Sequence, residues 1–98
     1  MNENEENIDE KVMKYRNLTE QALQKVELKQ GIGEEKERMA KKLLEMARSY
    51  FSDGKYFLKQ EKKLTALAAF SYAHAWIDAG VRLELLDGKN DDKLFVLP

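Results

Sequence analysis

Apolar residues recur along the chain at spacings of three and four positions, which is the repeat of an amphipathic helix. The first such run starts after Asn7, a favourable N-cap residue with Glu10 three positions later. Gly31 and Gly33 interrupt the pattern and provide a helix stop and a new start. This part of the chain therefore predicts a helix over residues 7–29. Its expected buried stripe is Ile8, Val12, Tyr15, Leu18, Ala22 and Val26.

The second run predicts a helix over residues 34–59. Its expected inner stripe is Met39, Leu43, Met46, Tyr50 and Phe57, flanked by Leu44, Ala47, Phe51 and Leu58. Asp53 and Gly54 lie in the middle of this run, yet the phase of the apolar positions continues beyond them. We therefore expect an unbroken helix in which Gly54 lets a neighbouring helix approach closely.

The third run follows a short link at residues 60–62 and predicts a helix over residues 63–86, ended by Gly88. An apolar C-terminal tail follows at residues 89–98. Helices of this length joined by short links favour antiparallel neighbours. The pattern thus predicts an all-α fold, an antiparallel up-down-up three-helix bundle, with residues 1–98 as one domain.

The segment Leu64–Val81 is unusually poor in charge, because its eighteen positions contain one charged residue, Asp78, in a chain that is 36% charged. A surface helix of a small protein has a polar face, so we expect this segment to be covered on most sides. A membrane span is disfavoured, because the segment is rich in alanine, which is only mildly hydrophobic, and its charge is costly in lipid.

Composition narrows the function classes further. Cysteine is absent, the N-terminus shows no secretory signal, and the net charge is −1. The first two features suit a cytoplasmic protein without disulfides. The net charge provides no overall attraction to nucleic acid, so we do not expect a nucleic-acid partner. Lys55, Lys59, Lys62 and Lys63 gather at one corner, which we interpret as a solvated corner.

The third helix carries polar residues in its centre. Ser71, His74 and Asp78 share one face, with His74 and Asp78 one turn apart. A catalytic triad is disfavoured, because three residues on one straight helix cannot reach triad geometry. A metal site is disfavoured as well, because zinc needs three or four ligands and no cysteine or second histidine is present. We interpret the residues as a buried polar layer completed by Tyr15 and Tyr50, and we expect no cofactor and no catalytic residue.

Small residues on the third helix suggest close packing against another element. We take Ala69, Ala73, Trp76 and Leu83 as candidate interface residues. Two partner helices cannot cover every side of a third, so either the tail at Leu94–Leu97 or a second copy of the chain is expected to cover the rest.

A family resemblance is carried by Tyr56-Phe57-Leu58, Ala68-Ala69-Phe70, the segment Tyr72–Gly80 (YAHAWIDAG), and Arg82-Leu83. There the chain resembles the archaeal proteins grouped as "domain of unknown function 357". The likeness is specific over about Ala47–Asp87 and weak in the first helix, with mild departures beside His74 and at Ile77. It implies a small archaeal cytosolic helical protein and no catalytic residues.

These observations favour a non-catalytic interaction or assembly module that binds a protein partner or a second copy of itself. The alternative is a helical domain that binds a small ligand, nucleotide or metal through the face of His74 and Asp78, as an enzyme or as an accessory to one.

Overall fold

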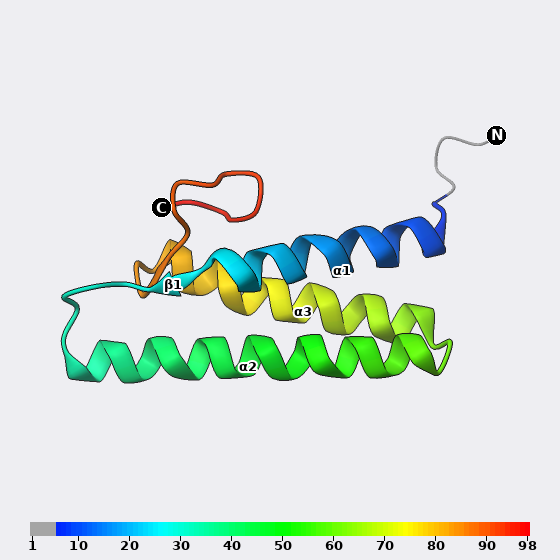
Figure 1. Ribbon diagram of the computed structural model, residues 1–98, viewed down its shortest axis with the longest axis horizontal. Coiled ribbons are helices and arrows are strands. Elements are labelled where there is room, and N and C mark those ends of the chain that lie inside the picture. The colour runs from blue at the N-terminus through cyan, green and yellow to red at the C-terminus, as the bar shows by residue number, and fades with distance from the viewer. Residues whose placement is uncertain (1–5) are drawn as a thin grey trace.

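The computed structural model describes residues 6–98 and contains three helices. They are α1 (Ile8–Lys25), α2 (Glu34–Lys59) and α3 (Lys63–Arg82), accompanied by two short strands, β1 (Glu27–Leu28) and β2 (Leu86–Asp87). Figure 1 shows the helices side by side along the long axis of the molecule, with α3 between α1 and α2. The all-α fold class is therefore confirmed.

α1 begins as predicted but ends earlier. The Asn7 side chain accepts a hydrogen bond from the backbone N–H of Glu10 and so caps the first turn. The helix ends at Lys25 rather than at residue 29, because β1 pairs antiparallel with β2. The pairing partners are far apart in the sequence, so the local sequence gives no sign of them.

α2 is continuous through Asp53 and Gly54, as predicted. The buried stripe, however, is displaced by one position from the predicted one, and Met39 and Met46 are exposed. The residues that face the core are Ala40, Leu44, Ala47, Phe51 and Gly54. Ala40, Ala47 and Gly54 in this stripe allow α2 and α3 to pack closely, and the methionines of the neighbouring stripe are left outside.

α3 ends at Arg82, before the predicted residue 86 and without using Gly88. Glu84 instead adopts left-handed backbone geometry (φ 61°). The N–H of Leu85 bonds to the carbonyl of Gly80, and the N–H of Glu84 bonds to the carbonyl of Val81. This is a Schellman ending, and it turns Leu85 and Leu86 into the core.

The same ending closes α2. Glu61 is left-handed (φ 59°), and the N–H groups of Lys62 and Glu61 bond to the carbonyls of Phe57 and Leu58. Both helix stops therefore place a glutamate at the position where glycine is commonest.

α3 is the main packing partner of the other two helices, whereas α1 and α2 touch each other little. One core cluster surrounds Phe70 and Phe51, and the other surrounds Ile77 and Leu86. The second cluster also includes Leu94 and Phe95 of the tail, which folds back beside the C-terminal end of α3 (Figure 1). The tail therefore covers part of α3, which is one of the two kinds of cover expected from the sequence; the other was a second copy of the chain.

Candidate functional site

The central polar residues of α3 hold the C-terminal tail. The His74 ring nitrogen Nε2 lies 2.6 Å from the carbonyl oxygen of Leu94. The Asp78 carboxylate accepts a hydrogen bond from the N–H of Val96 at 3.0 Å. One turn further on, the Arg82 guanidinium donates to the carbonyl of Leu97 at 2.7 Å. Residues four positions apart lie on one face of a helix, so His74, Asp78 and Arg82 form a single row along the tail.

Both ring nitrogens of His74 have a hydrogen-bonding partner. A carbonyl oxygen can only accept, so the Nε2 that faces Leu94 must carry a proton. The other ring nitrogen, Nδ1, lies 3.1 Å from the hydroxyl oxygen of Thr19. The Thr19 hydroxyl also donates to the carbonyl oxygen of Phe70 at 3.4 Å, so the His74 ring links a polar group of α1 to the main chain of the tail.

Thr19 was missed by the sequence reasoning, although it is the one polar residue of α1 that is fully buried. It lies in the stripe Val12, Tyr15, Thr19, Ala22 and Val26, whose spacing alternates between three and four. That spacing is the signal that could have identified it. The predicted stripe contained its neighbour Leu18, which is only half-buried.

The predicted polar layer is only partly assembled. His74 and Asp78 lie together, and Tyr15 lines the same small cavity of about 230 Å³ beside the tail. Ser71 is exposed, so its placement in a buried layer was wrong. Tyr50 of α2 is half-buried and lies against another side of α3, where its ring stacks on that of Tyr72 with centroids 5.0 Å apart.

Asp91 organises the start of the tail. Its carboxylate accepts hydrogen bonds from the N–H groups of Lys93 and Leu94 and forms an ion pair of 2.8 Å with Lys25 of α1. Lys25 and these backbone donors hold the pKa of Asp91 below its ordinary value. Phe95 then packs into the core beside Val81 and Gly88. The tail is thus fixed at its start by charge and along its length by apolar burial.

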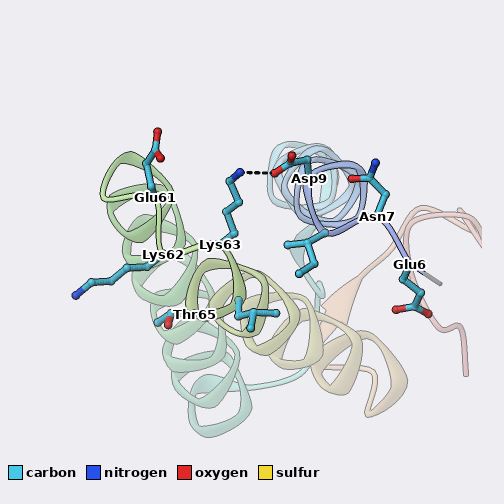
Figure 2. A pocket seen from close by; sticks show the side chains of 9 residues that line it. Glu6, Asn7, Asp9, Glu61, Lys62, Lys63 and Thr65 are labelled. Atoms are coloured by element: carbon cyan, nitrogen blue, oxygen red, sulfur yellow. Dashed lines mark ion pairs between the residues drawn. The ribbon is translucent and has the colours of Figure 1, made fainter.

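A shallow hollow lies between the beginnings of α1 and α3, and Figure 2 shows it from close by. Within it, Lys63 of α3 forms an ion pair of 2.6 Å with Asp9 of α1, while Glu61 and Lys62 point away. The hydrogen bond to Asp9 raises the pKa of Lys63. The pair neutralises one of the four corner lysines. Because it lies at the surface, it stabilises the contact between α1 and α3 only weakly.

A second surface lies along the seam between α2 and α3, and we call it the outer face. It consists of Met39, Leu43, Met46 and Tyr50 on α2, Tyr72, Trp76 and Ala79 on α3, and Leu83, the C-cap residue of α3. Two contacts join the two rows. Tyr50 stacks on Tyr72, and Leu43 lies 3.3 Å from the position that a β-carbon on Gly80 would take. Tyr72 is 59% exposed and Leu83 is 67% exposed.

The four candidate interface residues divide between surface and core. Leu83 is exposed and Trp76 is half-buried, so both belong to the outer face. Ala69 and Ala73 are buried within the chain, which corrects the prediction that they face a partner.

Residues 6–98 were searched for a metal site and for a membrane-spanning helix. Within that range no cluster of three or more histidine, cysteine or acidic residues could hold a metal ion. No helix among these residues is both long and apolar enough to cross a membrane.

The comparisons with known proteins give one match. The model of the family described as "Protein of unknown function (DUF357)" matches residues 14–86. This range includes most of α1, where the resemblance had been weak, and it ends just before the tail. The comparisons with curated proteins and with solved structures found no match. Because the family model covers most of the chain, the protein belongs to the DUF357 family, whose function is unknown.

Proposed function

We propose that this protein is a non-catalytic assembly module, an antiparallel up-down-up bundle of three helices that self-associates through its outer face. The packing of α1 and α2 on α3 and the side-by-side helices in Figure 1 support the bundle arrangement. The observation that carries the function is the exposure of large apolar side chains along one seam: Met39, Met46, Tyr72 and Leu83.

The geometry of the outer face suits another helical surface. Met39 and Met46 are seven residues apart and share a face of α2, while Tyr72 and Leu83, eleven residues apart, share a face of α3. Ala79 in this row and Ala75 beside it are exposed, so a second helix can approach the backbone of α3 closely. Contiguous apolar surface of this kind usually marks an interaction site.

Charge complementarity favours a second copy of the chain as the partner. Lys42 and Asp53 are eleven residues apart, so both lie on the same side of α2, next to the outer face. If two copies of α2 pair antiparallel about a two-fold axis between residues 47 and 48, Lys42 of each copy lies opposite Asp53 of the other. Neither residue takes part in an ion pair within residues 6–98.

We do not extend the proposal to a small ligand, nucleotide or metal at His74 and Asp78. Both ring nitrogens of His74 and one carboxylate oxygen of Asp78 already bind Thr19 and the tail. Part of the proposal is that the module works in the cytoplasm of an archaeon. The absence of cysteine and the resemblance of the segment around His74 support that setting.

Analytical ultracentrifugation over a range of concentrations tests the proposal. We expect a monomer–dimer equilibrium for the wild-type chain, and we expect Met46→Glu to weaken the dimer at least tenfold by placing a charge in an apolar interface. Met13→Glu is the matched control, because Met13 on α1 is similarly exposed (41%, against 38% for Met46) and lies outside the outer face.

Charge reversal tests the pairing itself. Lys42→Asp and Asp53→Lys should each weaken the dimer, and the double variant should restore it. A wild-type chain that remains monomeric at concentrations of about 1 mM overturns the proposal. So does a dimer that is equally sensitive to the substitutions at Met13 and Met46.

A further inference from the structure

The row His74, Asp78 and Arg82 binds the tail through its main chain. The bonded tail atoms are the carbonyl oxygen of Leu94, the amide nitrogen of Val96 and the carbonyl oxygen of Leu97. Every peptide carries these atoms, so the row recognises an extended segment irrespective of its side chains. We call the surface formed by this row and Thr19 the α3 groove.

The side chains of the tail show which segment the groove prefers. Leu94 and Phe95 are buried, Val96 is 53% exposed, and Leu97 is half-buried. Upstream, Asp91 pairs with Lys25 of α1. The groove therefore selects an acidic residue, two residues of any kind, an apolar residue, a phenylalanine, one free position and a second apolar residue.

The tail and the groove are separable parts of the chain. Thr19, His74, Asp78 and Arg82 all lie within residues 14–86, the range that matches the family model, whereas the tail lies beyond it. The connection between the two is strained, because Lys89 and Asn90 both have left-handed backbone geometry (φ 56° and 58°). A short segment held by a few contacts and joined through a strained turn opens more easily than the helices do.

We propose that the α3 groove is a docking site for an extended segment of a partner protein that carries this pattern. The tail of the chain occupies the groove in the partner's absence and must leave before the partner binds. The groove lies on another side of α3 from the outer face, since His74 and Tyr72 are two residues apart and point in nearly opposite directions. This inference is therefore independent of self-association.

A fluorescein-labelled peptide with the sequence of residues 90–98 is the probe, and fluorescence anisotropy is the measurement. In the wild-type chain the attached tail competes at an effective concentration of about millimolar. We expect the full-length double variant Leu94→Ser/Phe95→Ser, whose own tail no longer fits, to bind the peptide at least tenfold more tightly than wild type. Circular dichroism establishes that the variant keeps its helices, and Asp91→Lys is a second way to release the tail.

Two controls separate groove binding from stickiness. Adding Asp78→Ala to the tail-released variant should weaken peptide binding at least fivefold, because the acceptor for the Val96 amide is lost. A peptide with serine in place of both Leu94 and Phe95 should not bind.

Three results overturn the proposal. The first is a folded, tail-released variant that does not bind the peptide. The second is binding that Asp78→Ala leaves unchanged. The third is a wild-type dimer that disappears in the Leu94→Ser/Phe95→Ser variant, which assigns the groove to the tail of a second copy. A dimer formed through the outer face instead persists in that variant and disappears with Met46→Glu.

Discussion

A β-carbon placed on Gly54 of α2 would lie 2.5 Å from the ring atom Cε1 of Phe70 in α3. The two helices thus meet closely where α2 has no side chain, and Phe70 fills the space as one of the largest fully buried residues.

Gly54→Ala is expected to destabilise the protein despite the higher helix propensity of alanine. The clash with Phe70 should cost about 1–3 kcal/mol, against a propensity gain of about 1 kcal/mol. Chemical denaturation measures the net loss. Ser52→Ala, at an exposed position of the same helix, is the control and should change stability little. Equal denaturation midpoints for the two variants would show that α2 and α3 can move apart here without loss of stability.

Glycine at the two helix stops is expected to stabilise the chain. Glu61 and Glu84 hold left-handed geometry, which costs a residue with a β-carbon about 1–2 kcal/mol. Part of the gain is lost because glycine also increases the entropy of the unfolded chain, so each substitution should add about 0.5 kcal/mol. Thermal melting measures the effect. Glu61→Ala and Glu84→Ala retain the β-carbon and should give no such increase.

Acid is expected to loosen the tail before the helices. The pKa of Asp91 is lowered in the folded chain by Lys25 and by the backbone donors of the tail. Its contribution is therefore complete above the ordinary pKa of 3.8 and is lost as the pH falls through the lowered value. Hydrogen exchange of the Leu94 amide, followed from pH 7 to acid and compared with amides of α2, detects the loosening. Asp91→Asn should remove this pH dependence, and an unchanged profile would mean that another group controls the tail.

Asp78 should tolerate asparagine better than alanine. The Asp78 carboxylate accepts the Val96 amide at 3.0 Å, and the asparagine side-chain oxygen can accept the same bond. Asp78→Ala leaves that amide without its acceptor and should increase tail opening by about 1 kcal/mol, roughly fivefold. Hydrogen exchange at Val96 distinguishes the two variants. If both open the tail equally, the negative charge matters more than the hydrogen bond.

The helices were predictable because each carries a local repeat, and the continuity of α2 across Gly54 followed from the same repeat. The helix ends were less predictable. α1 stops where Glu27 pairs with Asp87 from the far end of the chain, and such a pairing leaves no local pattern.

The buried face of α2 illustrates a different difficulty. Two neighbouring stripes both have helical spacing, and hydrophobicity favoured the one with Met39 and Met46. Close packing favoured the stripe with Ala40, Ala47 and Gly54, because small side chains let α3 approach. Sequence spacing alone does not distinguish the two.

The candidate site was predictable only as a set of polar residues on α3. Grouping His74 with Asp78 was correct, but their partners are main-chain atoms of the tail, which have no sequence signature. The Tyr50 side chain, predicted to complete the same layer, stacks on Tyr72 at the seam between α2 and α3 instead.

The position of α3 also bears on the order in which the chain folds. Both other helices pack mainly on α3, but α2 reaches it through a short link, whereas α1 is distant from it in sequence. Contacts between near segments cost less loop-closure entropy and form sooner. The hairpin of α2 and α3 is therefore the natural folding nucleus, and α1 is the last helix to dock and the first to detach. An early opening of α1 would expose Val12 and Thr19 and would free the tail anchor at Lys25 in the same event.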